Sequence, residues 1–483
     1  VVLDRKTGKP LWSATAVHGW RHNAICAGDG RLYAVDRLSG LQEERLKRAD
    51  QPAGPPPRLV AFDLRTGKEL WSTSDGVFGT WLSYSEEHDV LVEAGRVARD
   101  TMTDEAKGMR ARKGSDGRAI WTDEKRLGPA MILGRTIHMV GRACDLLTGK
   151  PVLRAHPITE QDVEWTWTRT YGCNTPMLST HLLTFRSGAA GYFDLANDGG
   201  TGNFGGFRSS CTNNLVVAGG ILTAPDYTRT CTCGYQNQTS IALVPMPEAE
   251  MWTFYGSTDL KGAVRRLGVN LGAPGDRVDG KTLWLEHPSV GGKSPAAPVK
   301  LGGTPEYFRR HASRVKGPLP WVAASGARNV SSVTVTLDKS AKERAYRVRL
   351  VFVDPGGTAP FDVSLQGKTA IEKLAFEAPW TSVVREFQGV RAGKELRIDL
   401  SPPGVLSGLE IVCEESLAPE DKLAVVLADP GEDNEVLYFP RADGSDDESE
   451  DDEIPAEPFF WVAGALSALV VILLVVRMRG GRA

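Results

Sequence analysis

Four of the seven cysteines lie close together in the sequence, and thiols can bind a metal or cross-link the chain. Four thiolates could hold Zn²⁺, but Cys231 and Cys233 are one residue apart, whereas structural zinc sites space such pairs by two or more. In an exported domain we expect disulfides instead, and the odd total leaves at least one thiol unpaired within the chain. The disulfide candidates are Cys173, Cys211, Cys231 and Cys233.

Two pairs of polar residues have spacings that can support chemistry. Glu248 and Glu250 form a close carboxylate pair beside Trp252, and glycosidases use two carboxyl groups across a sugar. The flanking prolines favour a loop, so surface charge is the better interpretation. His18 and His22 have the helical spacing of a shared metal, but they follow a strand, where loop histidines are expected.

One motif matches the consensus sequence of a nucleotide-binding site but lacks the expected context. Residues 200–205 read Gly-Thr-Gly-Asn-Phe-Gly, which matches G-x-G-x-x-G, but the segment that follows is poor for a helix. We therefore expect a flexible loop there. Neither a Gly-x-Ser-x-Gly nor a His-Glu-x-x-His motif is present, and no catalytic residue or metal site is assigned.

Length and composition limit the function classes. The chain has 483 residues, which is enough for two to four domains at roughly 100–200 residues per domain. Its 52 glycines and 29 prolines favour many turns and therefore strands. The net charge of −3 gives no overall basic field, so a nucleic-acid partner is not expected.

Residues 459–476 are the clearest signal of location. They contain no charge and would be about 27 Å long as a helix, which just spans a bilayer. Acidic residues 446–453 precede them and three arginines follow within 477–483, so the positive-inside rule places this short tail in the cytoplasm. We expect a single-pass membrane protein with its ectodomain in the periplasm or outside. Because the chain opens on Val1 without a signal region, we expect it to be a fragment or processed.

Four segments repeat one pattern, at Asp4–Trp12, Asp63–Trp71, Gly114–Trp121 and Asp145–Leu153. The pattern predicts a hairpin in which a tight turn needs glycine for positive φ and the second strand ends in a large aromatic packed between sheets. The fourth copy keeps the turn and loses the tryptophan. The repeat residues are Gly8, Trp12, Gly67, Trp71, Gly117, Trp121 and Gly149.

These repeats resemble those of pyrroloquinoline-quinone-like (quinoprotein-type) β-propellers, a superfamily that includes quinoprotein alcohol dehydrogenases and an outer-membrane assembly scaffold. The resemblance covers about residues 1–255, with an N-terminally incomplete first blade. Unconnected surface hairpins are the alternative. The stretch from Tyr171 to Met246 also resembles membrane-associated propeller proteins of planctomycete bacteria.

The propeller resemblance implies one enzymatic hypothesis, in which pyrroloquinoline quinone (PQQ) stacks on tryptophan and binds through Ca²⁺ held by Asp, Asn and Glu oxygens. The candidates are Trp165, Trp167, Asn174, Asn213, Asn214 and Asp226. Alcohol dehydrogenases of this type carry two adjacent cysteines, and this chain has no such pair. Thr232 separates Cys231 from Cys233, so this feature of the alcohol dehydrogenases is not found at that position.

A strand-rich module follows at residues 300–415, after a connector at 256–299. Residues 346–353 alternate polar and apolar as a half-buried strand does, which predicts a β-sandwich. The order of its strands resembles malectin-like domains, which often bind carbohydrate; a generic sandwich is the alternative. Three aromatic residues near predicted loops are candidates for stacking on a sugar: Tyr307, Trp321 and Trp380.

The predicted fold class is therefore all-β: a partial propeller of tryptophan-containing repeats, a sandwich, an acidic linker at 416–458 and one C-terminal transmembrane helix. The preferred function is a non-catalytic envelope ectodomain that binds or scaffolds, with a glycan or a protein as partner. The alternative is a PQQ-dependent, membrane-bound dehydrogenase of alcohols or sugars, supported by the repeats alone.

Overall fold

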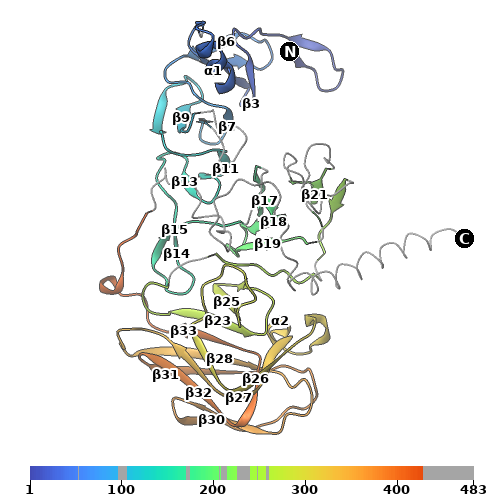
Figure 1. Cartoon of the computed structure of the whole chain (residues 1–483), viewed down its shortest axis with the longest axis vertical. Helices are drawn as coiled ribbons and strands as arrows, with labels where there is room; N and C mark the ends of the chain where they lie inside the picture. The colour runs from blue at the N-terminus through green and yellow to red at the C-terminus, as the bar shows by residue number, and fades with distance from the viewer. Residues whose placement is uncertain are drawn as a thin grey trace, which may run out of the picture.

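The computed structural model describes residues 1–52, 54–95, 106–169, 175–205, 207, 215–225, 240–246, 249–256 and 260–427. Within these ranges the regular structure is almost entirely strands, which confirms the all-β class. Small sheets follow one another from the N-terminus, and a larger two-sheet body lies at the opposite end of the long axis (Figure 1). No helix in the described ranges is long and apolar enough to cross a membrane, and the predicted helix at 459–476 lies outside them.

The N-terminal sheets are antiparallel and pair their strands in chain order. The first has two strands, β1 (Val2–Leu3) and β2 (Pro10–Trp12). The second has β3 (Trp20–Gly28), β4 (Arg31–Asp36), β5 (Arg58–Asp63) and β6 (Glu69–Thr73), with helix α1 (Gly40–Arg48) between β4 and β5. The third has β7 (Trp81–Ser85), β8 (Val90–Ala94), β9 (Met109–Lys113) and β10 (Ala119–Asp123).

Shorter sheets continue the series. They comprise β11 (Met131–Leu133), β12 (Thr136–His138) and β13 (Ala143–Asp145); β14 (Leu153–Ala155) and β15 (Asp162–Glu164); β16 (Met177–Leu178), β17 (Leu182–Ser187), β18 (Ala189–Asp194) and β19 (Thr201–Asn203); and β20 (Val216–Ala218), β21 (Ile221–Ala224) and β22 (Ile241–Leu243). Neighbouring sheets share small apolar cores. Tyr33 and Leu59 from the second sheet, for example, lie in one cluster with Leu82 and Leu91 from the third.

The Asp-x-x-Thr-Gly pattern closes each hairpin through its side chains. The Asp63 carboxylate accepts hydrogen bonds from the backbone N–H of Arg65 and from both the N–H and the hydroxyl of Thr66. Asp4 and Asp145 make the same three bonds in their own turns. The glycines after these threonines have φ near +70°, the left-handed conformation that glycine adopts without strain.

The larger body is a sandwich of two sheets. The five-stranded sheet contains β26 (Val299–Arg309), β27 (Ser325–Thr336), β32 (Glu395–Leu406), β29 (Phe361–Leu365) and β30 (Lys368–Leu374). The six-stranded sheet contains β24 (Arg277–Asp279), β25 (Thr282–His287), β23 (Arg266–Leu271), β33 (Gly408–Cys413), β28 (Arg344–Phe352) and β31 (Val383–Ala392). The short helices η1 (Ala312–Arg314), α2 (Pro320–Ala323) and η2 (Pro419–Asp421) lie in the connections.

One hydrophobic core joins the two sheets. Val348 and Ile411 enter it from the six-stranded sheet, and Val333 and Ile398 enter it from the five-stranded sheet. Alternate side chains of β28 are buried over most of the strand, which is the pattern that the sequence showed at residues 346–353.

The six-stranded sheet extends into residues 256–299, for which the sequence predicted only a connector. Strand β23 pairs with both β25 and β33 and so lies inside the sheet. Its residues from Leu267 to Leu271 are all buried, and its sequence, Arg-Leu-Gly-Val-Asn-Leu, alternates non-apolar and apolar residues as a strand does. The connector therefore supplies strands of the sandwich.

Candidate functional site

Each repeat tryptophan contacts the turn of the next repeat. Trp71 donates its indole N–H to the carbonyl of Gly114 over 2.9 Å, and a Cβ on Gly117 would lie 2.7 Å from its ring. The same arrangement joins Trp12 to Leu64 and Gly67, and Trp121 to Leu146 and Gly149. These residues thus hold consecutive sheets together.

A buried acidic residue fixes the loop that leads into each four-stranded sheet near the N-terminus. Asp36 accepts backbone N–H bonds from residues 17–19, and Glu93 accepts them from Phe78 and Gly79. Burial alone would raise the pKa of Asp36, but these hydrogen bonds lower it below its ordinary value. Glu93 also pairs with Arg112, which is 1% exposed. No sequence pattern indicated this role, because acidic residues are usually exposed.

The tryptophans proposed for a quinone are used in packing. Trp167 is 1% exposed, stacks on Phe185 with ring centroids 4.5 Å apart, and donates to the Met139 carbonyl. Trp165 is also buried and donates to Asp198 over 3.0 Å. Neither ring is presented at a surface. The oxygen candidates Asn174, Asn213, Asn214 and Asp226 lie outside the described residues.

Other residues proposed from sequence occupy ordinary positions. His18 lies 2.7 Å from the Pro55 carbonyl, in a segment that is not helical. Residues 201–203, inside the glycine-rich motif, form strand β19, and residues 206 and 208–214, where a helix would have to begin, lie outside the described residues. Cys173, Cys211, Cys231 and Cys233 are outside the described residues, as is Glu248. Three free cysteines are described: Cys26, Cys144 and Cys413.

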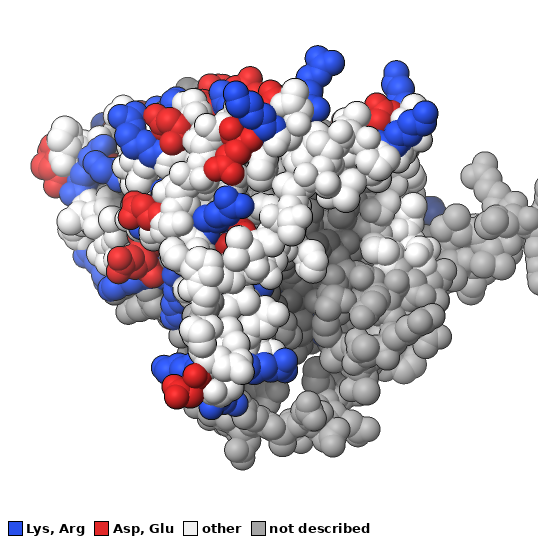
Figure 2. Space-filling view, turned by 90° about the horizontal axis from the view of Figure 1, so that it is seen from above, with Lys and Arg blue, Asp and Glu red and all other residues white. Residues whose placement is uncertain are grey.

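Charges of both signs cover the N-terminal end. Figure 2 shows Lys and Arg interspersed with Asp and Glu among the coloured residues of that face. In the described part of the chain, no group of three or more His, Cys, Asp or Glu residues is arranged to hold a metal ion.

A loop of the repeat region inserts into the sandwich. Ile158 is fully buried and belongs to the same hydrophobic cluster as the sandwich strands. Its carbonyl accepts a bond from the backbone N–H of Arg265 over 2.8 Å. His156 Nδ1 accepts the N–H groups of Ile158 and Thr159, which requires a neutral ring, and burial lowers the pKa of His156 to about 4. The two parts of the chain are therefore fastened together.

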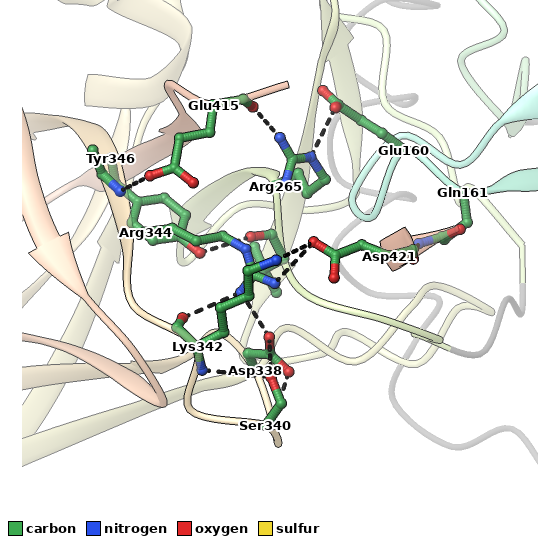
Figure 3. A network of polar contacts seen from close by, with 12 residues as sticks. Glu160, Gln161, Arg265, Asp338, Ser340, Lys342, Arg344, Tyr346, Glu415 and Asp421 are labelled. Carbon is green, nitrogen blue, oxygen red and sulfur yellow. Dashed lines mark hydrogen bonds and ion pairs between the residues drawn. The ribbon is translucent and has the colours of Figure 1, made fainter. Parts of the chain in front are cut away.

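The segment after the sandwich closes this junction (Figure 3). The Gln161 side chain donates to the Asp421 carbonyl over 2.8 Å and accepts the backbone N–H of Leu423 over 2.9 Å. Arg265 donates to Glu160 and to the Glu415 carbonyl. Because these partners are far apart in the sequence, no local pattern indicates the contact.

Charged side chains continue the network beneath Asp421. Lys342 lies 2.8 Å from its carboxylate, and this hydrogen bond is the main reason that the pKa of Asp421 is lowered. Arg344 joins Asp338 at 2.6 Å and Asp421 at 3.7 Å. The network positions the chain after the sandwich, and we find no substrate chemistry in it.

Asp276 and Glu286 form a buried carboxyl pair near the junction. Asp276 accepts hydrogen bonds from Ser294 and from the N–H groups of Tyr255 and Glu286. Glu286 accepts the Val290 N–H through Oε1, whereas its buried Oε2 has no hydrogen-bond partner in the described part of the chain. Burial raises the pKa of Asp276 to about 6 and that of Glu286 to about 7, the latter with a contribution from Asp276.

Trp380 lies at one end of the sandwich, in the loop between β30 and β31. Its backbone has φ of 58°, its N–H donates to the Asp354 carbonyl and its own carbonyl accepts the Lys316 N–H. The half-exposed ring meets Phe308 edge-on at 5.7 Å. The Arg310 guanidinium carbon lies 4.2 Å from the ring centroid, a close cation–π contact.

Trp321 packs against the same hydrophobic cluster as Trp380 and is likewise partly buried. Trp284 and Trp252 meet it edge-on at 5.3 and 6.2 Å, and Arg277 lies 4.7 Å above it. This ring is chiefly a packing element, because aromatic edges and a guanidinium already surround it.

Tyr307 is separated from these two tryptophans by the strand that carries it. It is 43% exposed, whereas its neighbour Phe308 points inward against Trp380. Successive side chains of a strand face opposite sides, so Tyr307 lies on the outer face of β26. The structure thus brings Trp321 and Trp380 to one end and leaves Tyr307 apart.

Comparison with known families identifies the repeats. The family model described as outer membrane protein assembly factor BamB matches residues 1–150. Residues 1–150 are thus similar in sequence to this family. The match includes all four turn motifs and the three Trp-to-turn interfaces described above.

Solved structures give only slight likenesses. BamB from Moraxella catarrhalis aligns with 17% identity and a TM-score of 0.30, over 44% of this chain and 57% of that chain. A Bacteroides uniformis beta-glucuronidase aligns with 15% identity and a TM-score of 0.26, over 40% and 22%. The ANX1 ectodomain from Arabidopsis thaliana aligns with 15% identity and a TM-score of 0.22, over 31% and 41%.

The aligned part spans less than two thirds of each of these solved chains, and scores of this size support no argument about function. No curated protein matches the chain.

Proposed function

We propose that this chain is an envelope protein whose sandwich binds a glycan and catalyses no reaction on it. The observation that carries the proposal is the placement of Trp380. An aromatic residue rarely adopts positive φ, and such a conformation persists only where the surrounding structure fixes it. Here hydrogen bonds to Asp354 and Lys316 hold the backbone while the ring stays half-exposed, as a platform for a sugar requires.

The finer architecture belongs to the same proposal. The repeat sheets would be blades of a partial propeller, and the sandwich would be a malectin-like module. Support for the first comes from four-stranded sheets in chain order joined by the repeat tryptophans. Support for the second comes from the strand order and the aromatic residues at one end.

The membrane anchor rests on sequence alone. Residues 459–476 would span the bilayer, with the described residues outside the cytoplasm and the arginines of 477–483 inside. Cysteine labelling of the intact cells would test this orientation: a thiol placed in the C-terminal tail should react only after the inner membrane is permeabilised. Reaction in intact cells would contradict the proposed topology.

The binding proposal is tested with the full chain in detergent and a panel of oligosaccharides, by titration calorimetry. Trp380→Ala should weaken binding by about tenfold or more, since loss of one aromatic contact costs roughly 1.4 kcal/mol or more. Tyr307→Ala is the matched control, because Tyr307 lies on the other face of β26, and its affinity should stay within about twofold of the unmodified chain.

Two results would overturn the proposal. If no saccharide binds saturably, a protein partner becomes the better candidate. If PQQ with Ca²⁺ binds and supports dye reduction with alcohols or aldoses, the chain is a dehydrogenase. Its cofactor site would then have to be located in the repeats.

A further inference from the structure

We infer that the glycan bound at the Trp380 end carries a negative charge, as a uronic acid carboxylate or a sulfate ester. This inference rests on the proposed function, because it names the ligand class for the same site. It is carried by five cations, three of which (Arg310, Lys316 and Arg277) lie beside the two tryptophans, and none of the five has a carboxylate partner in the described residues.

Four of these cations come from one short segment. Residues 309–316 read Arg-Arg-His-Ala-Ser-Arg-Val-Lys, with four positive side chains and no acid. Arg309, Arg314 and Lys316 are exposed, and Arg310 is half-buried. Arg277, above Trp321, is the fifth. In the described part of the chain, none of the five lies within ion-pair distance of an Asp or Glu.

Arg310 has the geometry of an anion receptor. Its guanidinium lies over the Trp380 ring, which occupies one face and leaves the N–H groups at the edge. Those N–H groups have no hydrogen-bond acceptor in the described part of the chain. A planar fork of free donors matches the two oxygens of a carboxylate or a sulfate.

Lys316 brings a second charge to the same ring. Its N–H donates to the Trp380 carbonyl, and its own carbonyl accepts the Ser382 N–H, so its backbone is fixed beside the tryptophan. Its side chain extends from this position into solvent. A ligand that touches Trp380 therefore lies near two positive groups.

The acids nearby are already engaged. Glu250 accepts the Ala312 N–H over 2.6 Å and the Trp252 indole N–H over 3.3 Å, and its nearest cation is His311 at 3.8 Å. Asp354 is buried and accepts N–H groups of the loop at 356–358. Neither acid forms an ion pair with Arg310.

Arginine also covers Trp321 at the same end, where the Arg277 guanidinium carbon lies 4.7 Å from the ring. Trp321 is chiefly a packing element, so a neutral sugar would have to stack on Trp380 and share that ring with Arg310. An acidic sugar gains from the same cation, so the repeated Arg-on-Trp arrangement favours the charged ligand.

The test compares matched oligosaccharides with the full chain: a neutral glucan, an oligogalacturonate and a sulfated glucan of equal length. Oligosaccharides with either acidic group should bind about tenfold or more tightly than the neutral one at low salt, and should weaken as salt is raised. Arg310→Gln should remove about tenfold of the acidic affinity and leave neutral binding within about twofold, with Arg310→Lys between them.

Arg397→Gln is the charge-matched control. Arg397 is exposed at the other end of β32 and pairs with Asp399, so its loss changes net charge equally without touching the site. If the neutral and acidic sugars bind equally, the inference fails while the glycan proposal stands. If Arg397→Gln weakens acidic binding as much as Arg310→Gln, attraction is non-specific and the inference also fails. If no sugar binds, the proposed function fails with it. If only the oligogalacturonate or only the sulfated glucan binds tightly, that result identifies the acidic group that the site recognises.

Discussion

The indole N–H of Trp71 reaches across a sheet boundary to the carbonyl of Gly114, 2.9 Å away. The ring also occupies the space where a side chain on Gly117 would lie. Gly117 therefore has two roles: it closes its own turn, and it leaves space for the tryptophan of the preceding repeat.

This dual role predicts that Gly117→Ala is more harmful than an ordinary turn substitution. The added Cβ would clash with Trp71 as well as strain a φ of 75°, so we expect a loss of unfolding free energy of about 2–4 kcal/mol. Gly30→Ala is the control, since its φ is 71° and no atom lies within 4 Å, and it should cost about 1 kcal/mol. Urea unfolding of the two variants measures the difference; equal losses would show that the Trp71 contact is unimportant.

Removing Glu93 should destabilise the third sheet strongly. Glu93→Ala leaves Arg112 buried beside two unpaired N–H groups, and such changes typically cost about 3–5 kcal/mol. Glu93→Gln keeps an acceptor for the loop and should lose less. Thermal unfolding followed by circular dichroism would rank the two variants, and the reverse order would contradict the loop-fixing role.

Gln161→Ala should release the segment after the sandwich without unfolding the sandwich itself. The variant loses both hydrogen bonds to residues 421–423, so limited proteolysis between 416 and 427 should become several-fold faster. Gln366→Ala is a matched control, because Gln366 makes comparable amide bonds to Arg391, Glu395 and Arg397 within the sandwich. An unchanged cleavage rate in Gln161→Ala would contradict the clamp.

The buried carboxyl pair predicts a specific pH dependence. Burial raises the pKa of Asp276 to about 6 and of Glu286 to about 7, so the folded protein holds protons that the unfolded chain releases between about pH 4 and pH 7. The contribution of this pair to stability is therefore present at low pH and lost as pH rises through that window.

Glu286→Gln removes one of the two carboxyl groups that bind more protons in the folded state than in the unfolded state. Between pH 4 and pH 8 its stability relative to the unmodified protein should improve by about 3 kcal/mol, because burial raises the pKa of Glu286 from 4.5 to about 7. Burial lowers the pKa of His138 and His156 to about 4, which has the opposite sign, but both histidines remain in each protein and cancel in the difference. The exposed Glu372→Gln should give a flat difference, and a flat curve for Glu286→Gln would refute the assignment.

The hairpins were predictable because their chemistry is local. Asp63, Thr66 and Gly67 lie within one turn, and their spacing alone dictates the hydrogen bonds and the positive φ that the structure shows. The partner of each tryptophan was harder to predict from the sequence, since Trp71 and Gly114 are on different repeats. Only the recurrence of the motif hinted that such contacts repeat.

The junction and the Trp380 end were beyond local patterns. Ile158 and Gln161 read as loop residues, yet one is fully buried and the other binds a segment more than 250 residues away. Trp380 was selected because it is aromatic and near a loop, but Arg310 above it was not, because cation–π stacking depends on the distance between two loops. Strand β23 differs from these, because its sequence alternates non-apolar and apolar residues and its local pattern was enough to predict a strand.

The clamp at Gln161 also determines how a mechanical load would enter the molecule. Asp421 and Leu423, which precede the chain beyond residue 427, are held at the seam between the repeats and the sandwich. A pull on that chain is transmitted first to one amide side chain and the ion pairs around it. The sheets on either side would bear the load only after these contacts have broken. The seam is therefore the part of the structure that yields first.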